Sequence, residues 1–137
     1  MLTASCLCGG IQLELHGNLR PVVNCHCSQC LKTHGNFAAY TNLPRSAVHY
    51  VKQDTLRWYR SSDTAQRGFC HGCGASVFWS RDDDDAISVA AGVLDAPTGL
   101  ATAADIFVAS KGDYYDINSG VPAYAASGNS SLDGPDR

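Results

Sequence analysis

Short stretches of alternating apolar and polar residues predict that this chain is built mainly from β-strands. Residues 11–16 place three aliphatic side chains on one face and Gln, Glu and His on the other, as a half-buried strand does. Glycine-containing turn signals stand on both sides of this stretch, at residues 9–10 before it and at residues 17–18 after it. We therefore expect a hairpin over residues 3–16, and its first strand would carry Cys6 and Cys8.

The same patterning predicts further short strands along the chain. They are expected at residues 22–25, 37–41, 48–52, 55–60, 66–70, 76–80, 87–91 and 106–109. Ser28 is a candidate N-cap for a short helix that runs to Lys32 or His34 and ends at Gly35. Trp58 and Trp79 are expected in the core. The fold class is therefore mainly β, with at most one or two short helices.

Composition indicates an ordinary globular protein. A chain of 137 residues is most simply one domain, here residues 1–124, and the Ser-, Gly- and Pro-rich residues 125–137 are expected to be a disordered tail. Only 10 Lys and Arg and a net charge of −3 argue against nucleic acid as a partner. No signal peptide and no membrane span are recognisable, so we expect a cytoplasmic protein. Residues 82–85, four aspartates in a row, are interpreted as a solvated turn rather than a cation site.

Seven cysteines carry the chemistry of this sequence. They occur as Cys6-x-Cys8, as Cys25-x-Cys27-x-x-Cys30 and as Cys70-x-x-Cys73. An odd number cannot all form disulfides within one chain, and these close spacings present thiolates to a soft metal such as zinc. Structural zinc sites are closed by four ligands, whereas catalytic sites have three protein ligands and one open position. Seven thiolates thus divide into four and three, which predicts two zinc ions per chain, one of them with an open position.

Spacing alone leaves the pairing of these motifs open. Cys27 and Cys30 would form a ribbon-like site with Cys70 and Cys73 as readily as the latter pair would join Cys6 and Cys8. Two histidines near the motifs are candidates for a fourth ligand at the second ion: His34 and His71. His26 lies between two of the cysteines, and we interpret it as an exposed or hydrogen-bonded bystander rather than as a proton shuttle.

The ordered motifs resemble the glutathione-dependent formaldehyde-activating enzyme family, which includes the centromere protein V relatives. The resemblance spans about residues 4–115. It rests on Ser-Cys-Leu-Cys-Gly-Gly from Ser5, Cys-His-Cys-Ser-Gln-Cys from Cys25 and Gly-Phe-Cys-His-Gly-Cys-Gly from Gly68, and on the matching segments 91–97 and 106–111. It implies a β-tent fold of coiled β-sheets joined by zinc.

The resemblance also implies the ligand sets and the activity. Cys6, Cys8, Cys70 and Cys73 would hold a structural zinc, and Cys25, Cys27 and Cys30 a second zinc at the active centre. The implied activity is that of a carbon–sulfur lyase, which interconverts formaldehyde plus glutathione and S-hydroxymethylglutathione. Its partners would be a small-molecule thiol and a carbonyl compound.

Two positions depart from the family pattern, and both concern the substrate pocket. Asp105 stands where the family usually has histidine, and Gly-Asp-Tyr ending at Tyr114 replaces Ala-Pro-Trp. Two function classes follow. One is a zinc-dependent lyase with an open pocket over the three-cysteine zinc, and the other is a non-enzymatic zinc module that binds a partner protein.

Overall fold

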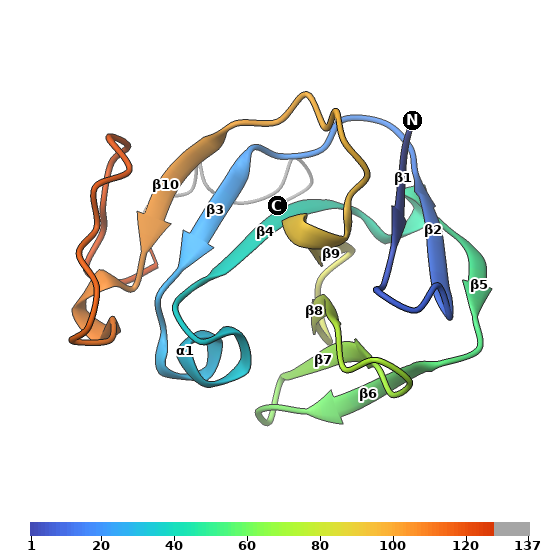
Figure 1. Ribbon diagram of the computed structural model, residues 1–137, viewed down its shortest axis with the longest axis horizontal. Coiled ribbons are helices and arrows are strands. Elements are labelled where there is room, and N and C mark those ends of the chain that lie inside the picture. The colour runs from blue at the N-terminus through green and yellow to red at the C-terminus, as the bar shows by residue number, and fades with distance from the viewer. Residues whose placement is uncertain (128–137) are drawn as a thin grey trace.

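The computed structural model describes residues 1–127, which form two β-sheets, one short α-helix and three turns of 3₁₀ helix (Figure 1). The smaller sheet is antiparallel and has the order β1-β2-β5. Its strands are β1 (Leu2–Ser5), β2 (Ile11–Leu15) and β5 (Val48–Gln53). The mainly β fold class is thereby confirmed.

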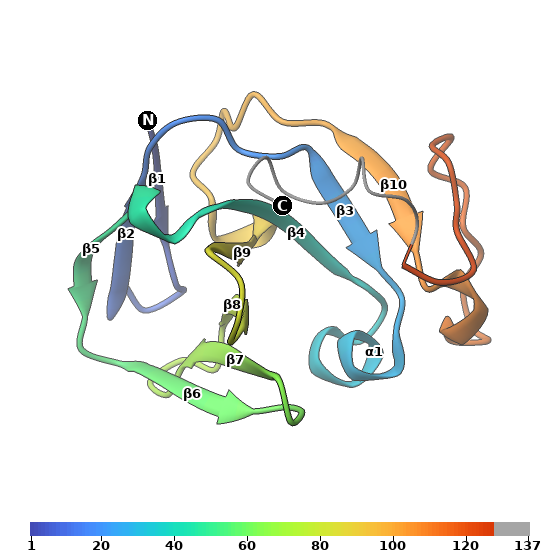
Figure 2. The same ribbon diagram turned by 180° about the vertical axis from the view of Figure 1, so that it is seen from behind.

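The larger sheet has seven strands in the order β10-β3-β4-β9-β8-β7-β6. Its strands are β3 (Val22–Cys25), β4 (Ala38–Pro44), β6 (Leu56–Arg60), β7 (Ala65–Cys70), β8 (Ser76–Arg81), β9 (Ala86–Ala90) and β10 (Thr102–Ile106). Every neighbouring pair is antiparallel except β10 and β3, which run parallel. Figures 1 and 2 show this sheet strongly bent, with β10, β3 and β4 in one limb and β6, β7 and β8 in the other.

The helices occupy connections between these strands. The helix α1 (Ser28–His34) follows β3 and lies at the open side of the bend (Figure 2). The 3₁₀ turns are η1 (Arg45–Ala47), η2 (Ala91–Val93) and η3 (Val108–Ser110). Gly35 ends α1 in the left-handed conformation at φ 93°, which explains the glycine at this position and confirms the predicted helix end.

Two groups of buried side chains stabilise the fold. The main core lies between the two sheets and combines aliphatic residues of β2, such as Leu13, with Phe78 of β8 and Val89 of β9. Cys6 and Cys70 belong to this core. A second, smaller group contains Cys30, Ala38, Tyr40 and Ala90. Each group of cysteines is therefore anchored in a different part of the buried interior.

Two local predictions about the cysteine loops are wrong. Strand β1 ends at Ser5, so Cys6 and Cys8 lie in the turn before β2 rather than on a strand. Gly9 adopts φ 78° there, and its N–H donates to the Cys6 carbonyl. Ser28 is not the N-cap of α1, because the Cys27 side chain accepts the capping hydrogen bond from the Cys30 N–H.

Two further predictions fail for steric and packing reasons. The strand predicted at residues 106–109 lies instead at Thr102–Ile106, because Phe107 adopts a left-handed conformation with φ 55° and ends it. Trp58 is 38% exposed rather than buried, since it stands on the edge strand β6 and stacks on Phe78 from outside.

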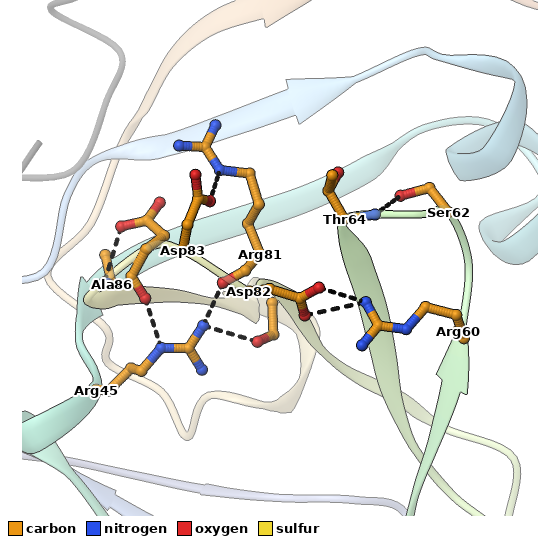
Figure 3. A network of polar contacts seen from close by, with 10 residues as sticks. Arg45, Arg60, Ser62, Thr64, Arg81, Asp82, Asp83 and Ala86 are labelled. Atoms are coloured by element: carbon orange, nitrogen blue, oxygen red, sulfur yellow. Dashed lines mark hydrogen bonds and ion pairs between the residues drawn. The ribbon is translucent and has the colours of Figure 1, made fainter.

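The four-aspartate loop forms a turn with mostly exposed side chains, as predicted, and ion pairs and hydrogen bonds also hold it (Figure 3). Asp82 pairs with Arg60, and Asp83 with Arg81. Arg45 donates to the carbonyl oxygens of Arg81 and Asp84, and thereby fixes the loop to the end of β4. Within residues 1–127, neither group of side chains that could hold a metal includes these aspartates.

A buried polar chain fastens the segment after η3 to the loop before α1. The His26 side chain is 1% exposed and lies 2.8 Å from Asp105 through Nε2 and 2.7 Å from the Tyr115 hydroxyl through Nδ1. Ser119 donates a hydrogen bond to the second oxygen of the Asp105 carboxylate. Burial opposes ionisation of Asp105, but the hydrogen bonds from His26 and Ser119 outweigh it and lower the pKa of this carboxyl group.

Part of the predicted tail lies within the described residues. Phe107 donates its N–H to the Ala126 carbonyl at 2.9 Å, and Val108 donates to Tyr124. Residues 128–137 lie outside the described residues, so the domain limit at residue 124 and the disordered tail stay predictions.

Removal of the Asp105 carboxylate should weaken the fold measurably. We expect Asp105→Ala to lower the free energy of unfolding by about 2–3 kcal/mol, because His26 would keep a buried ring nitrogen without its partner. Urea unfolding followed by circular dichroism measures this change. Asp113→Ala removes an exposed carboxylate of the same segment and is the matched control. Equal unfolding midpoints for the two variants would contradict the structural role of Asp105.

Candidate metal centre

Four cysteine side chains from two distant hairpins meet at one point. Cys6 and Cys8 come from the β1–β2 turn, and Cys70 and Cys73 come from the turn between β7 and β8. The sulfur of Cys8 lies 3.8 Å from that of Cys6 and 3.5 Å from that of Cys70. We call these four residues the four-cysteine set.

The geometry of the four-cysteine set fits a tetrahedral metal ion. All four sulfur atoms lie within 4.8 Å of one another. Four sulfurs around zinc at about 2.3 Å stand about 3.8 Å apart, so the observed separations match this arrangement. Four soft thiolates in such an arrangement are a donor set typical of structural zinc.

Hydrogen bonds prepare this set for a positive ion. The backbone N–H groups of Ile11 and Cys73 point at the sulfurs of Cys6 and Cys70, at 3.3 and 3.4 Å. The Thr55 hydroxyl lies 3.0 Å from the Cys70 sulfur and is the main reason why the pKa of this thiol falls to about 6. A thiolate is the form of cysteine that binds metal, so this contact favours metal binding at neutral pH.

The remaining three cysteines form a second set around the start of α1. Cys25 ends β3, Cys27 caps the helix and Cys30 lies in its first turn. Their sulfur atoms also lie within 4.8 Å of one another. Hydrogen bonds from the side chains of Cys25 and Cys30 hold the pKa of Cys27 well below its ordinary value, whereas the pKa values of Cys25 and Cys30 are raised, so one thiolate, at Cys27, is favoured in the free three-cysteine set.

This grouping resolves the alternative that sequence spacing left open. Cys70 and Cys73 meet Cys6 and Cys8, and not Cys27 and Cys30. Neither set includes a histidine among the described residues. His34 instead lies 3.3 Å from the Tyr40 hydroxyl through Nε2, and His71 is exposed. His26 is buried and hydrogen-bonded to Asp105 and Tyr115, and is not exposed.

The three-cysteine set borders a cavity of about 440 Å³ between the two limbs of the bent sheet. Aromatic side chains of Tyr40, Trp79 and Phe107 form part of its wall. Trp79, which the sequence placed in the core, packs against the second buried group and also lines the cavity. Burial raises the pKa of Tyr40 to about 12, so this wall carries a neutral phenol at physiological pH.

Positive charge is concentrated around the cavity although the chain as a whole is acidic. Arg20, Arg67 and Arg81 line it, and no Asp or Glu does among the described residues. Arg81 pairs with Asp83 at the edge of the sheet (Figure 3). Sequence analysis missed all three arginines, because they are dispersed along the chain and only the fold assembles them. Their presence favours a substrate with negative charge.

The two residues that depart from the family pattern, Asp105 and Tyr114, lie outside the cavity lining. Asp105 faces His26, as described above, and Tyr114 donates a hydrogen bond to the carbonyl of Gly35 at the end of α1. Neither residue lines the cavity. Both therefore support the loop that carries the three-cysteine set.

The structure is a mainly β protein with a cavity and two cysteine sets that could hold metal ions, and comparison with known proteins specifies the class. The family model of the glutathione-dependent formaldehyde-activating enzyme matches residues 1–110. The chain therefore belongs to this family, and family membership supports a function of that type on a small-molecule thiol and aldehyde.

A crystal structure of a Rhodobacter sphaeroides protein shares the fold. Its TM-score is 0.58 at 22% sequence identity, and the match covers 73% of this chain and 97% of that chain. At this identity the likeness is one of fold alone. No curated protein matches the chain significantly. Among the described residues, no helix has the length and apolar character that a membrane crossing requires.

The two sets should lose metal in two separate stages. We expect two zinc ions per chain, and the ion at the three-cysteine set should leave first because it has one protein ligand fewer. Elemental analysis during graded chelation measures both stages. A single ion throughout, or simultaneous loss of both ions, would contradict the division into four and three.

The two sets should also differ in their effect on folding. Cys8 and Cys70 are 62 positions apart, so a shared ion ties the N-terminal hairpin to the β7–β8 hairpin. Structural zinc contributes on the order of 10 kcal/mol, and Cys73→Ser should therefore unfold the domain or make it insoluble.

Cys27→Ser is the matched control, because it removes one sulfur from the three-cysteine set. We expect this variant to stay folded. Solubility, gel filtration and thermal unfolding compare the two proteins. If both variants melt alike, the structural and functional roles of the two sets are wrongly assigned.

Proposed function

We propose that this chain is a zinc-dependent carbon–sulfur lyase that interconverts formaldehyde plus a glutathione-like thiol and their S-hydroxymethyl adduct. One observation carries the proposal: three cysteine sulfurs without a fourth ligand among the described residues border a cavity large enough for a small molecule. In this proposal the four-cysteine set holds a structural zinc, and Cys25, Cys27 and Cys30 hold the zinc of the active centre.

The reaction requires an activated sulfur and an accessible carbonyl carbon. In the synthetic direction the thiol loses its proton, its sulfur forms a bond to the carbon of formaldehyde, and the carbonyl oxygen takes up a proton. The reverse direction breaks the same carbon–sulfur bond. A zinc ion held by three cysteines would offer an open position to the thiol sulfur and would lower the pKa of the thiol.

The residues of the chain supply position and environment. Cys25, Cys27 and Cys30 line the cavity together with the aromatic residues Tyr40 and Trp79. Glutathione carries two carboxylates, and the arginines of the cavity wall offer charges that attract such groups. These features support a thiol that bears negative charge.

The open cavity also favours an enzyme over a binding module. A module that only holds a partner protein would be expected to close its second metal site with a fourth ligand beside an exposed apolar patch. Here the cysteines border a cavity instead. All seven cysteines are free, so a reducing compartment such as the cytoplasm is the expected setting of the enzyme.

Exchange spectroscopy at equilibrium tests the reaction directly. Protein that is fully loaded with zinc should raise the rate of interconversion between glutathione plus formaldehyde and the hydroxymethyl adduct above the spontaneous rate. Cys27→Ser and Cys30→Ser should abolish this increase while the fold persists, because each removes a ligand of the active zinc.

The controls separate catalysis from background. The uncatalysed reaction is itself quick, so protein-free samples at the same pH are measured in parallel. Ser28→Ala changes an exposed residue next to Cys27 that has no role in the proposed site, and it should keep the full rate. No acceleration by the zinc-loaded protein would reject glutathione and formaldehyde as the substrate pair.

A further inference from the structure

One arginine of the cavity wall differs from the other two because it reaches the cysteine sulfurs. Arg67 stands in the middle of β7, opposite Trp79 of β8. Its Nη2 atom lies 3.6 Å from the sulfur of Cys30 and 3.3 Å from Oε1 of Gln29. Both contacts lead to the first turn of α1, which contains Cys30 and is capped by Cys27.

A second contact holds this arrangement in place. The Gln29 side chain donates through Nε2 to the carbonyl oxygen of Ser61 at 3.0 Å. Its other amide atom, Oε1, is thereby oriented toward Arg67. Strand β7 and the start of α1 are thus joined through a positioned guanidinium group.

The charge of Arg67 has no carboxylate partner. Among residues 1–127, the ion pairs of arginines are Arg60 with Asp82 and Arg81 with Asp83, and none includes Arg67. Its Nε and Nη1 atoms are buried and have no hydrogen-bond partner in the described structure. A buried charge is costly unless an opposite charge offsets it. Tyr40 beside it is a neutral phenol, so the cysteine sulfurs are the available source of negative charge.

The formal charge of the three-cysteine set with a bound metal ion suggests what the contact between Arg67 and Cys30 does. Three thiolates around a divalent ion carry a formal charge of −1, and the guanidinium brings the total to zero. A fourth thiolate would bring the same centre to −2 without the arginine and only to −1 with it. At short range in a partly buried site such a difference is substantial.

We propose that Arg67 is the counter-ion of the three-cysteine site, where it stabilises Cys30 as a thiolate ligand and offsets the charge of an incoming thiolate sulfur. Arg67 is a positioning residue in this role, since it acts on the metal ion through Cys30. The inference rests on the proposed function, because it requires a metal ion at the three-cysteine set. It identifies an anionic sulfur as the fourth ligand that the site is built to accept.

Cobalt binding tests this role without reliance on catalysis. Protein that keeps zinc in the four-cysteine set after mild chelation is refilled with cobalt, and competition with a chelator gives the cobalt affinity of the three-cysteine set. Arg67→Met removes the charge, and Arg67→Lys keeps a charge without the planar fork. Arg57→Met is the matched control, since Arg57 is exposed on β6 and donates to the carbonyl oxygen of Leu56.

The variants should separate charge from packing. Loss of a group that supports a metal ligand typically weakens metal affinity about 10–100-fold, and we expect such a loss in Arg67→Met. Arg67→Lys should recover part of the affinity, and Arg57→Met should bind cobalt as the unchanged protein does. Absorption from thiolate-to-cobalt charge transfer should change on glutathione addition in the unchanged protein and much less in Arg67→Met.

Three results would overturn the inference. Cobalt affinity equal to that of the unchanged protein in Arg67→Met would show that the sulfurs need no counter-ion. An equal loss in Arg67→Lys and Arg67→Met would show that shape rather than charge matters. If Arg67→Met does not retain zinc at the four-cysteine set, Arg67→Gln replaces it. No cobalt at the three-cysteine set of the unchanged protein would instead overturn the proposed function, and the inference with it.

Discussion

The convergence of four sulfurs from two hairpins is the constraint on which this structure depends. Cys6 and Cys8 stand near the start of the chain, whereas Cys70 and Cys73 stand near its middle, and the two pairs belong to different sheets. Their sulfurs lie at distances that suit one tetrahedral ion. A metal ion shared by the four sulfurs would offset the conformational entropy that is lost when the long loop between the two pairs is closed. Cys6 and Cys70 also belong to the main core.

The three-cysteine set, unlike the four-cysteine set, is assembled from residues that are close in the sequence. Its three members lie within one short stretch of chain, so local structure brings them together: the end of β3, the N-cap of α1 and its first turn. Local closure leaves one side of the set without a protein ligand, and the bent sheet places the cavity there. Long-range closure thus joins two hairpins at the four-cysteine set, and local closure produces a set that borders a cavity.

Electrostatics connects the second set with the rest of the fold. The chain has a net charge of −3, yet three arginines and no carboxylate line the cavity in the described structure. On the other side of the loop, the Asp105 carboxylate faces His26 and not the sulfurs. The negative group therefore supports the loop from behind, while the positive groups face the cavity. This separation suits a site that holds thiolates and takes an anionic substrate.

The sequence alone determined the fold class, most strands and both sets of candidate ligands. Alternation of apolar residues located β2 closely, because a half-buried strand must alternate. The cysteine turn located β7 and β8, and Gly35 marked the helix end through its tolerance of positive φ. Motif spacing identified the cysteines because close thiols are needed for a soft metal. Spacing did not determine which pairs share an ion, since that depends on which hairpins meet in space.

Only the tertiary structure decided the surroundings of the cysteines. Arg20, Arg67 and Arg81 lie far apart in the sequence and show no common pattern, so their assembly around one cavity follows from the bend of the sheet. Strand β10 ends before its predicted limit because Phe107 adopts a left-handed conformation. Trp58 is partly exposed because it lies on the edge strand β6. The buried His26–Asp105 pair likewise joins two residues that lie near the ends of the parallel strands β3 and β10. Local patterns encode local geometry, whereas partners that are distant in the chain are selected by packing.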